Sequence, residues 1–191
     1  MLFIIFCLLE ALICSTDGLN EKSLIDAAIK TLKYFNEFQQ KDVKFENKKP
    51  FTDLKFTYSP LTIDNFQFRF DEYKLLHIKF VNLKSTLEGK YKYGRFFGVA
   101  SFTAQLSSFN WEQVFVVTQD TLSNGKIEIK YKLHEESALK FNIFRLNSQK
   151  TKYDEELKKN LLMFDYNDLK TQLRKVPKLI FDTLQTDLNR Y

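Results

Sequence analysis

Cysteine and glycosylation signals are scarce in this sequence. Its two cysteines, Cys7 and Cys14, both lie in an apolar stretch at the start of the chain. If that stretch is removed, the remaining chain has no thiol, which excludes disulfides, cysteine nucleophiles and cysteine metal ligands. No Asn-x-Ser/Thr sequon occurs, so N-glycosylation is not expected. A secreted domain without disulfides must be stabilised by its core, and 191 residues are enough to form one.

Residues typical of catalytic centres are equally few. There are two histidines and five glycines, with no Gly-rich phosphate loop, no Gly-x-Ser-x-Gly and no His/Cys metal spacing. His77 alternates with apolar neighbours, which predicts a solvated histidine on the outer face of a strand. His134 precedes two glutamates and is expected in a connecting loop. The sequence therefore predicts no enzyme, no catalytic residue, no metal site and no cofactor.

Residues 1–15 are apolar except for Glu10. This length is too short for a membrane span and is typical of a secretory signal peptide, with cleavage between residues 15 and 18. A buried N-terminal helix is the alternative. No linker or repeat follows, so residues 19–191 are expected to form one secreted domain.

Phenylalanine is abundant, with 20 residues against a single tryptophan. So many phenylalanines either fill a large core or line a cavity, and composition leaves both open.

A helical period over residues 19–38 is followed by a charged stretch at 40–50 that predicts a loop. From residue 51 onward the period is two. This alternation predicts six or seven antiparallel strands, with separate strands at 95–107 and 109–119, and Asn124-Gly125 predicts a hairpin.

Two long patterns define the expected architecture. In 75–93, LLHIKFVNLKSTLEGKYKY, the apolar parity changes near Val81-Asn82, which predicts a bulge that curls a long strand. From Leu162 to Leu188 an apolar stripe predicts one long helix with a kink at Pro177. The fold class is therefore α+β, with a long curved antiparallel sheet wrapped around a long C-terminal helix, plus an N-terminal helix.

The run LLHIKFVNLKSTLEGKYKY, the later FTAQLS, the NG hairpin and the C-terminal helix together resemble the N-terminal domain of bactericidal/permeability-increasing protein and its relatives. The resemblance implies the tubular lipid-binding (TULIP) fold, with an apolar tunnel for phospholipid, lipid A or another acyl ligand. The disulfide of the bactericidal members cannot form here. The chain also has one tubular unit, as in the mite group 7 allergens, so ligand identity does not carry over. The helix-grip fold is the structural rival, but it places a strand before its first helix.

The apolar faces supply the candidate binding site for a lipid or another hydrophobic small molecule. An ordinary dry core is the alternative for each of these residues. The candidates are Leu76, Ile78, Phe80, Leu87, Phe102, Trp111, Phe115, Ile129, Tyr131, Phe141 and Ile143 on the sheet, with Leu169, Leu173, Val176 and Ile180 on the helix.

Basic residues are spread along the chain, and the net charge is +5. Lys90, Lys92 and Arg95, near a hairpin end, are expected to attract the headgroups of an anionic membrane transiently. A solvated strand face is the simpler alternative. Nucleic acid is not expected, because acidic residues interrupt the basic ones. The sequence thus favours a secreted carrier of a hydrophobic ligand, and a secreted interaction or structural module with a filled core is the alternative.

Overall fold

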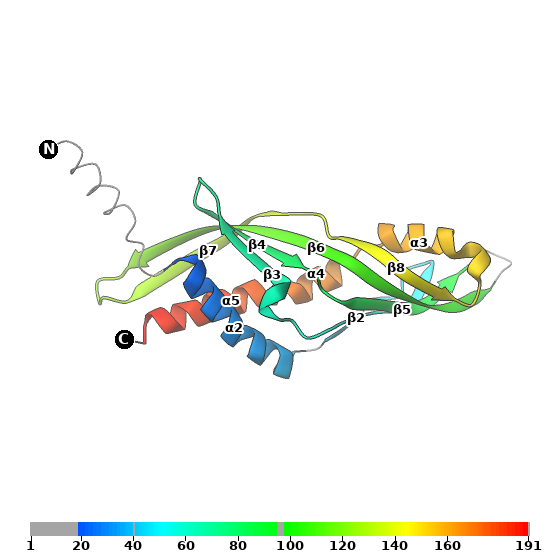
Figure 1. Ribbon diagram of the computed structural model, residues 1–191, viewed down its shortest axis with the longest axis horizontal. Coiled ribbons are helices and arrows are strands. Elements are labelled where there is room, and N and C mark those ends of the chain that lie inside the picture. The colour runs from blue at the N-terminus through cyan, green and yellow to red at the C-terminus, as the bar shows by residue number, and fades with distance from the viewer. Residues whose placement is uncertain (1–18, 40, 95–97, 191) are drawn as a thin grey trace.

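The computed structural model describes residues 19–39, 41–94 and 98–190, which form an elongated α+β domain (Figure 1). The predicted fold class is confirmed. The helices are α2 (Glu21–Phe38), α3 (Asp154–Met163), α4 (Asn167–Leu173) and α5 (Lys175–Leu188), with 3₁₀ turns at Ile63–Asn65 and Thr151–Tyr153. The strands are β1 (Asp42–Lys44), β2 (Phe51–Tyr58), β3 (Phe66–Phe70), β4 (Leu75–Val81), β5 (Ser85–Lys92), β6 (Val99–Thr121), β7 (Ile127–Glu136) and β8 (Lys140–Ser148).

Strand β6 organises the sheet because its 23 residues pair with four other strands. Its first half pairs with β5 on one side and β8 on the other, and its second half pairs with β4 and β7. All these pairings are antiparallel. The two strands predicted at 95–107 and 109–119 are therefore one strand. The register of the β8 pairing shifts between Ser107 and Asn110, where the partners of β6 change.

The single long strand with a bulge predicted for 75–93 is wrong, because this stretch forms two strands, β4 and β5, which pair with successive parts of β6. Between them Asn82 has a φ of 53°, in the left-handed region that asparagine tolerates better than most residues. The parity change predicted there is confirmed, since the apolar residues on both sides of the break are buried. These residues are Leu76, Ile78, Phe80, Leu83, Leu87, Tyr91 and Tyr93.

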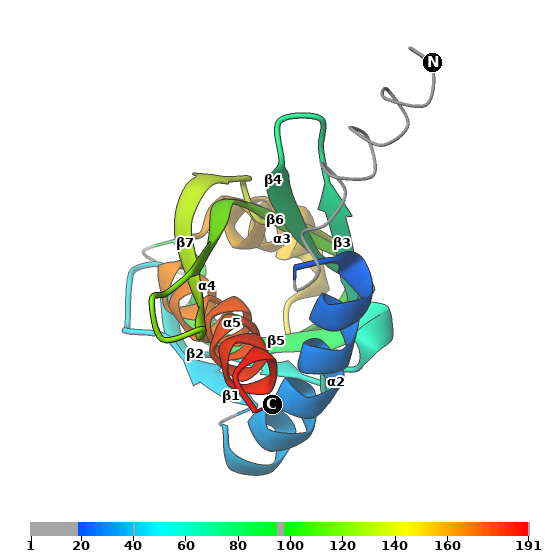
Figure 2. The ribbon, with the colours of Figure 1, turned by 90° about the vertical axis from the view of Figure 1, so that its left-hand side faces the viewer.

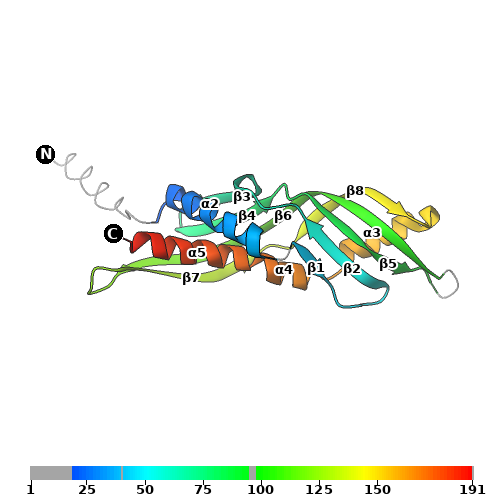
Figure 3. The ribbon, with the colours of Figure 1, turned by 90° about the horizontal axis from the view of Figure 1, so that it is seen from below.

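Helix α2 begins with a capping box. Asn20 Oδ1 accepts a hydrogen bond from the Ser23 backbone N–H at 2.9 Å, and Ser23 Oγ accepts one from the Asn20 N–H at 3.1 Å. The helix lies beside α5 (Figures 2 and 3), where the Thr31 and Thr183 hydroxyl groups are 3.0 Å apart. The N-terminal and C-terminal helices thus cover one end of the curved sheet together.

The single C-terminal helix predicted from the apolar stripe is wrong, because three helices carry that stripe. Phe164 is extended after α3, and Asp165 Oδ1 accepts from the Asn167 N–H at 3.2 Å as α4 begins. A second interruption falls at Arg174. Pro177 explains it, because proline has no N–H to donate to the carbonyl four residues earlier, and that residue is Leu173, the last of α4.

Two short segments also differ from prediction. Strand β1 lies inside the stretch predicted as a loop, with Val43 buried opposite Phe56. Strand β7 continues through His134 to Glu136, which were predicted as a loop. In both places charged residues outnumber apolar ones, so the sequence shows no strand period. Pairing with β2 and β6 decides the structure there.

The α4–α5 junction is tied to β7 by an ion pair. Arg174 donates two hydrogen bonds to the Glu136 carboxylate, Nε to Oε1 at 2.9 Å and Nη2 to Oε2 at 2.6 Å. Glu136 is largely buried, whereas the Arg174 side chain is 43% exposed and is screened by solvent. We expect Arg174→Ala to lower the free energy of unfolding by about 1 kcal/mol. Chemical denaturation should show this loss, whereas Lys178→Ala, exposed on the same helix, should change stability little. Equal effects of the two variants would contradict the role given to this ion pair.

Candidate ligand-binding site

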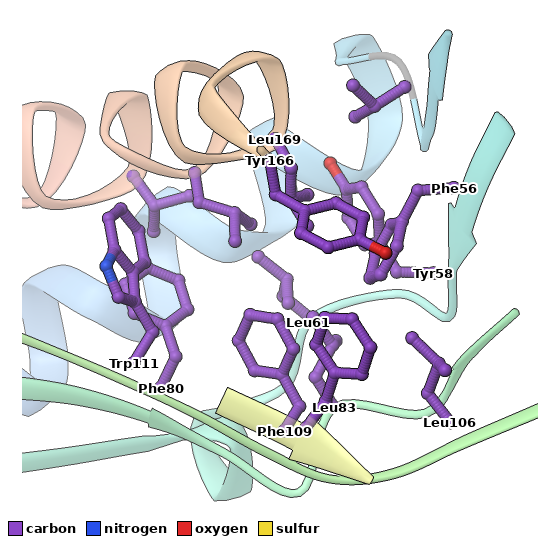
Figure 4. Close-up of a cluster of buried hydrophobic side chains, with 14 of the residues drawn as sticks. Phe56, Tyr58, Leu61, Phe80, Leu83, Leu106, Phe109, Trp111, Tyr166 and Leu169 are labelled. Carbon is purple, nitrogen blue, oxygen red and sulfur yellow. The ribbon is translucent and has the colours of Figure 1, made fainter. Parts of the chain in front are cut away.

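The residues predicted to line a binding site lie in one hydrophobic cluster. Thirteen of the fifteen are buried, and Tyr131 and Ile143 are partly buried against the same cluster. Side chains from the sheet, including Phe80 and Trp111, point toward the helices, from which Leu169 and Tyr166 point back (Figure 4). The sheet and the C-terminal helices thus bring the predicted set together, as core residues whose role as a ligand lining stays a prediction.

Aromatic rings make up much of this interior. The Phe80 and Trp111 rings are opposite each other on β4 and β6, with centroids 5.3 Å apart. In the middle of α5, the Phe181 ring stacks on Tyr131 with centroids 4.1 Å apart. Phe181 was not among the predicted residues, although it directly follows Ile180 and is 1% exposed. Helix α5 therefore contributes a wider face to the interior than the single stripe predicted.

Three buried polar side-chain atoms of β6 have no hydrogen-bond partner among the described residues: Trp111 Nε1, Gln113 Oε1 and Gln119 Oε1. The first two, a donor and an acceptor, belong to residues that are 1% exposed, whereas Gln119 is only partly buried. Sequence reasoning missed Gln113. The signal was present, because Gln113 shares the parity of Trp111 and Phe115. A polar residue at that position of an apolar face is unusual.

A groove at the surface borders this interior between β8 and the α3–α4 connection. Its volume is about 470 Å³, within the range of about 300–1,000 Å³ typical of small-molecule sites. Phe141 and Tyr166, both members of the buried cluster, form part of its wall, with ring centroids 5.1 Å apart. Exposed Leu162 lies at the groove as well. Phe141 and Tyr166 therefore belong both to the wall of the groove and to the buried cluster.

Tyr166 is held in place by its hydroxyl group, which donates to the Leu161 carbonyl at 2.7 Å. Burial raises the pKa of Tyr166 above its ordinary value of 10.0. The unfolded chain therefore loses this proton at a lower pH than the folded one, so stability falls as the pH rises above 10. We expect Tyr166→Phe to be less stable by about 1 kcal/mol at pH 8, because the hydrogen bond is lost. Its melting temperature should then fall less steeply than that of the wild type above pH 10.

The control for this experiment is Tyr73→Phe, since Tyr73 is 76% exposed. It should follow the wild-type curve. Identical slopes for Tyr166→Phe and the wild type above pH 10 would contradict the assignment of the alkaline loss to Tyr166.

The predicted headgroup residues are only partly described. Lys90 is exposed, and its ammonium group is 2.8 Å from Asp53 Oδ2, so an anionic surface would compete with that carboxylate. Lys92 is exposed two residues farther along β5. Arg95 lies outside the described residues, as does the predicted signal peptide at 1–15. Contact with a membrane surface therefore stays a prediction.

His77 differs from its prediction. It lies on the outer face of β4, but its side chain is only 17% exposed because two carboxylates hold the ring. Nδ1 is 2.8 Å from Glu112 Oε1, and Nε2 is 3.2 Å from Asp71 Oδ2.

Within the described ranges, no group of three His, Cys, Asp or Glu side chains is placed to hold a metal ion. In the same ranges, no helix has the length and apolar character needed to cross a membrane.

Comparisons with known proteins show similarity only at the level of distant structures. No protein-family model and no curated protein matches the chain. Among solved structures, Takeout 1 from Epiphyas postvittana is similar, with a TM-score of 0.35 and 14% identity over 88% of this chain and 91% of that one. The α+β architecture therefore rests on the strands and helices of the chain itself.

Proposed function

We propose that this chain is a secreted carrier that holds a hydrophobic small molecule between its sheet and its helices, as a single-unit tubular lipid-binding protein. The apolar leader at 1–15 supports secretion. The continuous apolar interior, enclosed by β4, β6 and α5, supports the binding of an apolar molecule without catalysis. Burial of each methylene group of such a ligand contributes about 0.8 kcal/mol, so a long chain binds with few polar contacts.

The observation that carries this proposal is the groove between β8 and the α3–α4 connection. It is open to solvent on one side and is bounded by the buried pair Phe141 and Tyr166 on the other. A change of rotamer at these two rings would join the groove to the core. An apolar interior that a ligand can reach from the surface is what a carrier requires.

Native mass spectrometry tests the proposal. Protein purified from a secretory host without detergent should carry a single small molecule per chain, which organic extraction removes and identifies. Asn142→Trp, at an exposed groove position, should reduce the occupied fraction because the indole fills the entrance. Arg145→Trp, exposed on the same strand outside the groove, is the matched control. A bare mass that persists after incubation with mixed lipids would refute the carrier.

A second candidate function is a protein-interaction module, and one exposed ring favours it. Phe144 on β8 is 77% exposed at the edge of a mainly apolar surface groove of about 620 Å³, which Leu106 and Lys84 also line. Large exposed apolar side chains beside such a groove are typical of interaction sites. Phe144→Ser would abolish binding of a protein partner and would leave a ligand in the interior unaffected.

A further inference from the structure

Trp111 and Gln113, each with an unpaired side-chain atom, are neighbouring inward-facing residues of β6. Residues two apart on a strand share a face, and their Cα atoms are about 6.8 Å apart. Gln113 faces inward because it is opposite Ile78, which is fully buried on β4. An unpaired buried donor or acceptor lowers the stability of a fold. The fold thus retains one unsatisfied donor and one unsatisfied acceptor on neighbouring inward-facing residues.

The orientation of the Gln113 amide is fixed by its neighbours. Its Nε2 donates to Glu136 Oε1 at 3.3 Å, and the same carboxylate accepts from Arg174. Because a carboxylate accepts hydrogen bonds, the NH₂ group must face Glu136, which turns Oε1 away from it. The acceptor on Gln113 is therefore held by the ion pair that ties the α4–α5 junction to β7.

We propose that this pair binds the hydroxyl group of a long-chain alcohol, which would accept from Trp111 Nε1 and donate to Gln113 Oε1. This inference rests on the proposed carrier function and specifies the ligand. One hydroxyl oxygen bridges two partners that are about 4.5–5 Å apart, a spacing within reach of two side chains at neighbouring inward positions. A carboxylate has no proton to donate to Gln113, and an ether has none either. Alcohols are therefore preferred over both.

Binding of three ligands with the same carbon chain tests this inference: hexadecanol, its methyl ether and hexadecanoate, each delivered from cyclodextrin to the full-length protein. In calorimetry, hexadecanol should bind the wild type about tenfold more tightly than the ether, the value of one donated hydrogen bond in a dry site. Gln113→Leu should lose this preference and retain the affinity for the ether. Gln105→Leu, exposed on the outer face of β6, is the matched control and should keep it.

The outcomes separate the inference from the function on which it rests. Equal wild-type affinities for hexadecanol and its ether would overturn the hydroxyl site and leave the carrier standing. Tighter binding of hexadecanoate would also overturn it. Failure of all three ligands to bind would refute the carrier itself. If Gln113→Leu does not fold, as judged by thermal unfolding, Trp111→Phe tests the other half of the pair. It removes the donor from which both oxygens accept, so it should weaken hexadecanol and its ether alike. Unchanged affinities of both ligands for Trp111→Phe would overturn the hydroxyl site.

Discussion

Ile180→Asp is expected to lower the free energy of unfolding by about 4 kcal/mol, a large part of the about 5–15 kcal/mol typical of a domain. Ile180 is fully buried on the face of α5 that packs against the sheet. Its atoms belong to an apolar cluster, so an aspartate there would have no cation to pair with. Urea denaturation followed by circular dichroism measures the loss.

Lys178→Asp is the matched control, since Lys178 is exposed on the same helix. It introduces the same side chain two residues away and should change the free energy of unfolding by less than about 0.5 kcal/mol. Comparable losses for the two variants would mean that α5 does not pack on the sheet in solution. The architecture described above would then be wrong at its C-terminal helix.

Trp111→Ala is expected to cost about 3–5 kcal/mol of stability, because it leaves a cavity opposite Phe80. Trp111→Phe should cost much less. It retains a ring in van der Waals contact with Phe80 and removes the unpaired indole N–H, whose burial is itself unfavourable. Thermal unfolding of the two variants beside the wild type gives the comparison.

Comparing the stability losses of the two Trp111 variants shows whether the indole N–H is unpaired in the folded protein. A large loss in Trp111→Phe, similar to that in Trp111→Ala, would show that the indole N–H has a partner in the folded protein. The donor would then not be available to a ligand, and the hydroxyl site on β6 would be excluded.

Much of the sheet could be predicted from the sequence, because side chains that alternate between core and solvent leave a period of two. The parity change at Asn82 was visible for that reason, and the NG turn before β7 was visible from its residues. The continuity of β6 could not be predicted in the same way. The pair Ser107-Ser108 suggests a break between two strands, whereas pairing with β4, β5, β7 and β8 keeps β6 extended through it.

The helices and the site show where sequence periodicity fails. The apolar stripe from Leu162 to Leu188 fits one helix, but Leu162 is 54% exposed because the chain turns after α3. That turn depends on Phe164 packing beside Phe45 and Phe51, which lie more than a hundred residues away. Likewise, Trp111 was predictable as an inward residue, whereas its unpaired N–H depends on every group around it. The periodicity of a sequence predicts which face of a strand or helix a residue occupies, but it does not predict the hydrogen-bond partners of that residue.

Quenching of Trp111 fluorescence would show whether a hydrophobic ligand enters the interior, because Trp111 is the only tryptophan and is 1% exposed. A long-chain alcohol brominated along its chain quenches an indole only on contact. The carrier account predicts saturable quenching that is complete at one alcohol per chain and is reversed by unbrominated hexadecanol. Quenching that rises linearly without saturation, or emission that does not change, would contradict the claim that the interior beside Trp111 holds a hydrophobic ligand.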